Sequence, residues 1–239
     1  MKYKSLLIIL LSILTCAVAA KPKVLIFCKT AGYHHKCIEV AIPVIVKLGK
    51  GNNFDADTTT DSKKFTYNNL KQYAAVIFLS TTGDVLNDTQ QSEFERYIRA
   101  GGGFVGVHSA TDTEYGWPWY GNLVGAYFSK HPAQQSATFH VIDQKFIATK
   151  NLPAEWKRFD ELYNFKWISK DIHVLITIDE KSYTGGENGE YHPMSWYHEY
   201  DGGRAFYTAL GHTDESYADP LYLGHLLGGI KYAMGSAKI

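Results

Sequence analysis

Apolar residues occur in short unbroken runs along the first half of the chain, and segments with helical periodicity separate these runs. The runs span residues 23–28, 74–79 and 104–107, where apolar and polar positions do not alternate. Such runs are typical of strands buried on both faces of a parallel sheet. Residues 36–47 and 87–100 place apolar positions on one helical face. The alternation predicts βαβ units with right-handed crossovers, and therefore an α/β fold with a mostly parallel central sheet.

The second half of the chain has a less regular pattern. The elements that it predicts are an aromatic, glycine-rich loop over residues 115–121, strands over 138–142 and 173–178, a hairpin turning at 201–203, and a closing helix over 220–234. The chain contains no internal repeat, low-complexity tract or linker. We therefore expect residues 21–239 to form one domain.

The first twenty residues have the pattern of a secretory signal. Lys2 and Lys4 precede an apolar stretch over residues 6–14, and small residues follow at 17–20. This stretch is too short to span a membrane, so we predict a signal peptide over residues 1–20 and a periplasmic or secreted protein. Lipoprotein processing at Cys16 is the alternative, and a lipid on that cysteine would tether the protein to a membrane.

Charge and cysteine content narrow the classes of partner and chemistry. Removal of the predicted signal takes away two lysines and no acids, so the 24 basic residues become 22 against 24 acidic ones, a formal charge of −2. That balance, without a basic run, argues against a nucleic-acid partner. Two cysteines remain, Cys28 and Cys37, and we expect two packed thiols rather than a disulfide.

Polar residues cluster where four predicted strands end. These clusters are Gly32-Tyr33-His34-His35, Ser80-Thr81-Thr82, His108-Ser109-Ala110-Thr111-Asp112 and Gly211-His212-Thr213. The carboxyl ends of parallel strands meet at one edge of a sheet, where α/β proteins bind ligands. Asp160-Glu161 could reach over the same pocket. Histidine beside a carboxylate is the usual equipment for general acid–base chemistry, because imidazole exchanges a proton near neutral pH.

Other interpretations of these residues remain open. His34 and His35 could simply hold a turn, and His108 could be a core histidine at a strand end. Several histidines with a carboxylate could bind zinc, although no tight spacing such as H-x-x-x-H supports a metal site. His131, His140, His173 and His225 have no companion group in the sequence, and His192 lies near the hairpin. Motifs of serine hydrolases, P-loops and dinucleotide-binding folds are absent from the sequence.

These pieces together resemble the ThuA-like family, named for trehalose utilisation. The matching segments are residues 30–35, 101–112, 160–163 and 193–212, which occur in order along nearly the whole mature chain. The resemblance implies a class I glutamine-amidotransferase-like fold, a three-layer α/β sandwich of flavodoxin type. It also implies a role in the use of sugars or glycosides. Exported members of the family are often described as secreted glycosyl hydrolases.

One departure from the wider superfamily concerns the nucleophile. Amidotransferases place a cysteine at the turn after this strand, whereas the present chain has His108-Ser109 there. We therefore expect no thiol-dependent glutamine hydrolysis. Ser109 lacks the glycines of a nucleophile elbow, so we do not expect it to be the nucleophile either.

The resulting hypothesis is an exported enzyme that acts on a small-molecule carbohydrate through histidine and carboxylate groups. The predicted catalytic residues are His108, Asp112, Glu161 and His212. The predicted substrate-binding residues are Tyr33, His34, His35, Thr81, Ser109, Trp117, Trp119 and Trp196. No cofactor is expected, with a divalent metal ion as the open alternative. A non-catalytic carbohydrate-binding or scaffold domain on the same fold is the competing hypothesis.

Overall fold

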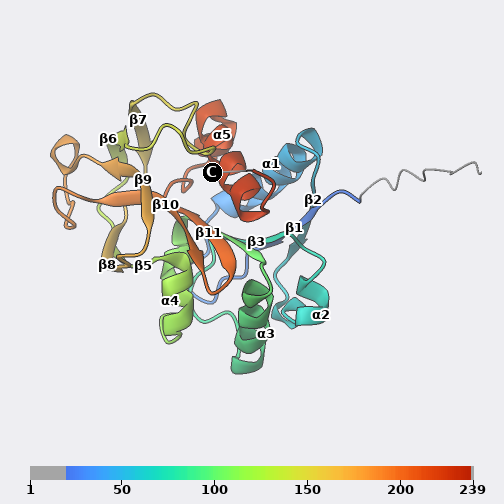
Figure 1. Ribbon diagram of the computed structural model, residues 1–239. Coiled ribbons are helices and arrows are strands. Elements are labelled where there is room, and N and C mark those ends of the chain that lie inside the picture. The colour runs from blue at the N-terminus through green and yellow to red at the C-terminus, as the bar shows by residue number, and fades with distance from the viewer. Residues whose placement is uncertain (1–19, 238–239) are drawn as a thin grey trace, which may run out of the picture.

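A central sheet lies between two layers of helices in the computed structural model, which describes residues 20–237 (Figure 1). The sheet has nine strands in the order β2-β1-β3-β4-β11-β10-β9-β6-β7. The five strands from β2 to β11 pair in parallel. They are β1 (Lys23–Phe27), β2 (Asp55–Thr59), β3 (Ala75–Leu79), β4 (Gly103–Val107) and β11 (Gly203–Thr208). This arrangement confirms the predicted α/β sandwich.

An antiparallel extension continues the sheet beyond β11. It comprises β10 (Pro193–Tyr200), β9 (His173–Ile178), β6 (Gln135–Val141) and β7 (Glu155–Asp160), and a separate two-stranded sheet pairs β5 (Ala126–Lys130) with β8 (Asn164–Ile168). Strands β10 and β11 confirm the predicted hairpin. Strands β5, β7 and β8 are absent from the sequence prediction. In β7 the buried residues are Trp156, Arg158 and Asp160, whereas Phe159 is exposed, so no alternation of apolar and polar residues marks this strand.

Helices cover both faces of the parallel strands (Figure 1). One layer holds α1 (Cys37–Gly51) and α5 (Pro220–Ala233), and the other holds α2 (Tyr67–Leu70), α3 (Asp88–Arg99) and α4 (Pro118–Val124). Short 3₁₀ segments are η1 (Ser62–Lys64), η2 (His108–Asp112), η3 (Glu180–Ser182) and η4 (Asp214–Ala218). Asn87 caps α3 and forms a capping box with Gln90, as expected of a residue that satisfies the first free amides.

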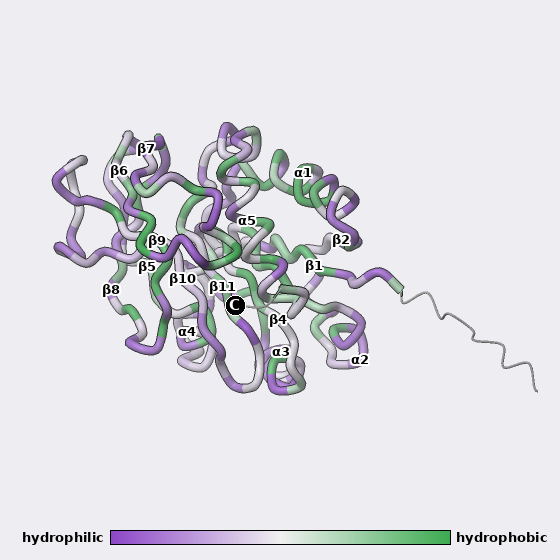
Figure 2. Tube along the Cα trace, turned by 45° about the horizontal axis from the view of Figure 1, so that its top comes forward, coloured by the Kyte–Doolittle hydropathy of each residue, from purple (hydrophilic) through white to green (hydrophobic). Residues whose placement is uncertain are grey.

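The core gathers around the parallel strands. Every residue of β3 and β4 is buried, and Figure 2 shows hydrophobic positions in the middle of the molecule with hydrophilic ones along the outer turns. The ring of Phe78 packs against Phe27, Phe94 and Phe104. Cys28 and Cys37 are buried, free thiols, which confirms the expectation of packed cysteines. A densely packed interior of this kind holds strand ends in fixed positions.

The predicted signal peptide, with Cys16, lies almost entirely outside the described residues. Among residues 20–237, none of the helices combines the length and the apolar character that crossing a bilayer requires.

Candidate functional site

The site is built where β4 ends and the chain turns into η2. His108, the first residue after β4, has a left-handed backbone with φ of 52°. Such a conformation costs about 1–3 kcal/mol in a residue other than glycine, and persists only where its surroundings fix it. Here the His108 carbonyl accepts a hydrogen bond of 2.7 Å from the Tyr207 hydroxyl, and Nδ1 lies 2.9 Å from the carbonyl oxygen of Ala209. The imidazole is completely buried and held in one orientation.

Four side chains meet at this strand end, and we call them the histidine–glutamate cluster: His35, His108, Glu161 and His212. Each offers one nitrogen or oxygen atom, and these four atoms lie within 4.8 Å of one another. Nε2 of His108 lies 3.3 Å from Oε2 of Glu161 and 3.1 Å from Nδ1 of His212. The same His212 nitrogen lies 3.2 Å from Oε2 of Glu161. Segments far apart in the sequence therefore converge on a single point.

Asp160, the last residue of β7, joins the antiparallel extension to the cluster. Its Oδ1 accepts hydrogen bonds from the backbone amides of Glu161 (3.0 Å) and His212 (3.1 Å). Its Oδ2 accepts from the Gly211 amide at 3.1 Å and from Arg158 at 3.0 Å. The carboxylate is fully buried. One side chain thus fixes both of the backbone segments that present Glu161 and His212.

Ionisation in the cluster follows from burial and from the neighbouring charges. Burial opposes the charge of Glu161, but hydrogen bonds and charges from His108 and His212 outweigh it and hold the pKa of Glu161 well below its usual range. Burial, together with the nearby histidines, lowers the pKa of His35 to about 3. Burial also disfavours the charged form of His212, yet Glu161 and Asp160 raise its pKa. At neutral pH the cluster therefore contains a carboxylate and a neutral His35.

A pocket of about 360 Å³ opens beside the cluster. Its lining comprises the cluster members His35 and Glu161 together with Tyr33, Asp112, Phe128, His131 and Tyr163. A second hollow of about 320 Å³ is lined in part by His212 and also by Tyr33. Burial raises the pKa of Asp112, whose Oδ1 accepts a hydrogen bond of 2.7 Å from Tyr115. The pocket thus combines polar groups with aromatic walls, which is the composition of small-molecule sites.

The structure brings together most of the residues predicted from the strand ends. All the predicted catalytic residues lie in the cluster or line the pocket. Ser109 lies behind the cluster, with Oγ 3.3 Å from Nδ1 of His35. Thr81 is buried and bonded to Thr113, whose hydroxyl donates to the Ser109 carbonyl, so it does not face the pocket. His34 is exposed outside the cluster, where Nδ1 lies 3.2 Å from the Thr30 hydroxyl.

The three predicted tryptophans are not brought to the cluster. Trp196 is fully buried and donates to the carbonyl of Val124. Trp117 and Trp119 stack on each other, and their indole nitrogens bond Glu95 and Asp201. Asp201 precedes β11, whereas the cluster follows it, so these rings lie at the opposite edge of the sheet. Their large apolar area is used in packing, and any stacking on a ligand has to come from other rings.

Sequence reasoning set His131 aside because it has no companion group in the sequence, and it assigned no site role to Phe128 or Tyr163. His131 follows β5, and its Nδ1 lies 3.4 Å from Oε1 of Glu161. Phe128 and Tyr163 pack with ring centroids 4.2 Å apart in the pocket wall. Pairing of β5 with β8 brings this wall to the site. No local pattern indicates that long-range pairing, so the sequence offered no signal for these residues.

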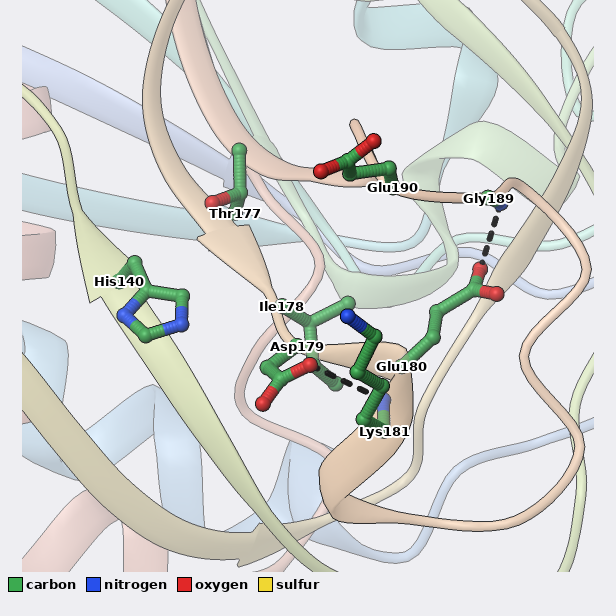
Figure 3. Close-up of a pocket in the computed structure, with 8 residues that line it drawn as sticks. All are labelled: His140, Thr177, Ile178, Asp179, Glu180, Lys181, Gly189 and Glu190. Atoms are coloured by element: carbon green, nitrogen blue, oxygen red, sulfur yellow. Dashed lines mark hydrogen bonds between the residues drawn. The ribbon is translucent and has the colours of Figure 1, made fainter.

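A larger hollow of about 680 Å³ lies on the antiparallel extension, between β6, β9 and η3 (Figure 3). Its residues include His140, Thr177 and Glu180, and none belongs to the cluster. Glu180 already accepts hydrogen bonds from the amide of Gly189, as Figure 3 shows, and its Oε1 lies 2.9 Å from His192 Nδ1. Among the described residues, the group of converging histidine and carboxylate donors is the histidine–glutamate cluster, so we take the cluster rather than this hollow as the candidate reactive site.

Comparison with known proteins points to one family. Residues 23–233 match the ThuA family model, described as trehalose utilisation. A ThuA-like protein of Bacteroides uniformis superposes with a TM-score of 0.78 at 28% identity, covering 91% of this chain and 93% of that one. A ThuA-like protein of Parabacteroides merdae gives 0.71 at 22% identity, covering 92% and 93%. A β-galactosidase of Bacillus circulans shares the fold over part of its length (0.58, 14% identity, 90% and 31% covered). None of the curated proteins matches this chain.

Proposed function

The chain belongs to the ThuA family of trehalose utilisation, and on that premise we propose that it is an enzyme that processes a small sugar or glycoside at the histidine–glutamate cluster. The observation that carries the proposal is the juxtaposition of this buried polar centre with a pocket of about 360 Å³. A domain that only binds carbohydrate needs aromatic platforms and hydrogen-bond donors. Four converging titratable groups, of which His35 and Glu161 line the pocket, are instead typical of a reaction site.

The proton-transfer groups of the proposed reaction are those that face the pocket. His108 is completely buried, whereas Asp112 and His131 line the open space. Burial raises the pKa of Asp112 in the direction of neutral pH. A general acid or base works best when its pKa lies near the pH of the reaction. His131 lies beside Glu161 and is about 42% exposed, so it can meet a bound substrate. Glu161 would orient that imidazole, and the ring of Tyr33, 68% exposed, would stack on the sugar.

Asp112→Asn tests the proposal because the two side chains have nearly the same shape. We expect turnover of the cognate sugar to fall by about a hundredfold to ten-thousandfold, as is usual for loss of a general acid or base. The cognate sugar is first identified by thermal-shift screening with disaccharides and oxidised sugars. Asp171→Asn, an exposed carboxylate outside the pocket, is the matched control. Unchanged turnover in Asp112→Asn contradicts the role of Asp112, and binding without any turnover favours the carbohydrate-binding alternative.

We also propose export of the protein through the signal sequence at residues 1–20. Mass spectrometry of the protein from the periplasm or the medium should find a new N-terminus near Ala20 or Lys21. A lipid on Cys16 would replace the free protein with a tethered one, and an intact Met1 would contradict export.

A further inference from the structure

We propose that the histidine–glutamate cluster is a binding site for one divalent transition-metal ion of the Zn²⁺ type. The donors are three imidazole nitrogens, from His35, His108 and His212, and one carboxylate oxygen of Glu161. Imidazole with carboxylate suits zinc and the neighbouring first-row metals, whereas Mg²⁺ and Ca²⁺ prefer sites made of oxygen alone. A metal here deepens the proposed function, on which its catalytic meaning rests, but the binding itself is measured without substrate.

The spacing of the donors fits one small ion. Zinc lies about 2.0–2.1 Å from nitrogen and oxygen ligands in a tetrahedral site, and a tetrahedron of that size has edges of about 3.3 Å. Nε2 of His108, Nδ1 of His212 and Oε2 of Glu161 form a triangle with sides of 3.1, 3.2 and 3.3 Å. His35 offers a fourth donor to the same point. Three ligands already stand at the separations that a bound ion would impose.

The surroundings fix the ring nitrogens for ligation. A carbonyl oxygen only accepts hydrogen bonds, so the contact of His108 Nδ1 with Ala209 places the proton on Nδ1 and a lone pair on Nε2. Ser109 occupies Nδ1 of His35 and leaves Nε2 for a ligand. The side-chain amide of Gln134 lies 2.7 Å from Nε2 of His212, on the far side from the cluster. Ligating histidines are characteristically held in this way through their second nitrogen.

The charge and the burial of the histidine–glutamate cluster favour a bound metal cation. His35 and His108 pack with ring centroids 4.7 Å apart and both are nearly inaccessible to solvent, so two protonated rings here would repel each other strongly. A metal ion binds neutral imidazoles and is balanced by the Glu161 carboxylate. Asp160, directly beneath, is itself paired with Arg158 and anchors the backbone instead of competing for the ion.

A metal ion at this position would touch the pocket through Glu161 and His35, which line it. A bound divalent ion lowers the pKa of a coordinated water or hydroxyl and polarises carbonyl oxygens. Asp112 and His131 lie in the same pocket, where they can accept or return the proton. The substrate class that fits is a sugar with a hydroxyl or carbonyl oxygen that can approach the ion.

The test measures metal content and needs no sugar. The full chain, produced without a histidine tag, is stripped with a chelator, exposed to Zn²⁺, Mg²⁺ or Ca²⁺, dialysed and analysed by inductively coupled plasma mass spectrometry. We expect about one Zn²⁺ per chain, no retained Mg²⁺ or Ca²⁺, and a melting temperature that rises with Zn²⁺ concentration. Co²⁺ should give the visible absorption of a four- or five-coordinate site and be displaced by Zn²⁺. That spectrum reports on the wild-type protein, so it serves even where a ligand variant fails to fold.

Variants locate the bound ion. Glu161→Gln should weaken Zn²⁺ binding by more than about a hundredfold, and Ser109→Ala, which acts through His35, by about tenfold to a hundredfold. Glu155→Gln in β7 and His173→Gln in β9 are exposed matched controls that should bind like wild type. Absence of retained Zn²⁺ in the wild type, or wild-type binding by folded Glu161→Gln, overturns the metal site. Either result leaves the sugar-processing function to be decided separately by Asp112→Asn.

Discussion

The parallel half of the sheet and its antiparallel extension differ in how they are packed and in what they give the site. Strands β3 and β4 are buried throughout and flanked by helices on both faces. Strand β7 alternates exposed and buried residues. The parallel half supplies all three imidazoles of the cluster, whereas the extension supplies Glu161, and the separate β5–β8 sheet brings Phe128 and His131 to the pocket wall. The tightly packed parallel half, which we call the frame, thus carries the histidines. More exposed strands form the part of the pocket that a ligand would contact.

The largest expected effect is on stability, and it is seen by replacing one phenylalanine with alanine in each half. Phe78→Ala removes a ring at the centre of the aromatic core and should lower the free energy of unfolding by about 3–5 kcal/mol. Phe159→Ala removes a ring of β7 that is 51% exposed and should change it by less than about 0.5 kcal/mol. Urea denaturation of both variants measures the difference. Equal losses would show that the extension is packed as tightly as the frame.

Asp160→Asn weakens one contact between the two halves, which the pairing of β10 with β11 also joins. The carboxylate is buried and paired with Arg158, and it accepts three backbone amides. Loss of the charge should cost about 3 kcal/mol, because Arg158 then lacks its buried partner. The loss should appear in hydrogen exchange as faster opening around residues 211–212 than in β1. A uniform change across the sheet would argue against a local junction.

Acid should destabilise the fold through three buried histidines. His198 lies in β10 and His192 directly precedes that strand, whereas His225 lies in α5 and contacts Ser195 of β10. Burial lowers the pKa of His225 to about 4, and it also lowers those of His192 and His198. Because the unfolded chain titrates near 6.5, it binds more protons than the folded chain between that pH and about 4. Stability is therefore lost as pH falls through this window, by up to about 1.4 kcal/mol per pH unit for each group. Denaturation at pH 7 and pH 5 should show a shallower dependence in His225→Gln; an unchanged slope contradicts the assignment.

The smallest expected effect is the change in turnover when the two cysteines of the frame are replaced. Burial raises the pKa of Cys37 to about 12 and also raises that of Cys28, so both remain protonated at neutral pH. A protonated, inaccessible thiol is a poor nucleophile. Cys28→Ser and Cys37→Ser should keep turnover within about twofold of wild type, a change of about 0.4 kcal/mol in the barrier. Abolished activity in a folded variant would restore a thiol mechanism.

The same contrast explains what the sequence predicts and what it does not. In the frame, the signals are local: apolar runs mark β1, β3 and β4, and Asn87 marks the start of α3. Polar residues at the ends of those strands led directly to the imidazoles of the cluster. In the extension, charged residues interrupt β7. The position of His131 depends on the pairing of β5 with β8 in the separate two-stranded sheet. The sequence did not show that the three tryptophans pack away from the cluster, because large aromatic rings are equally suited to a core and to a sugar-binding site.

The position of β11 has a consequence for how the chain is made. β11 spans Gly203–Thr208, yet it pairs with β4, which ends at Val107. Roughly 100 residues therefore leave the ribosome after β4 before its partner exists, which takes about 5–20 s at about 5–20 residues per second. Throughout that interval β4 presents an unpaired, wholly apolar edge, the kind of surface through which strands of different chains associate. A chain that stops before Gly203 should aggregate, because β11, which lies at the centre of the sheet, is the last strand to be synthesised.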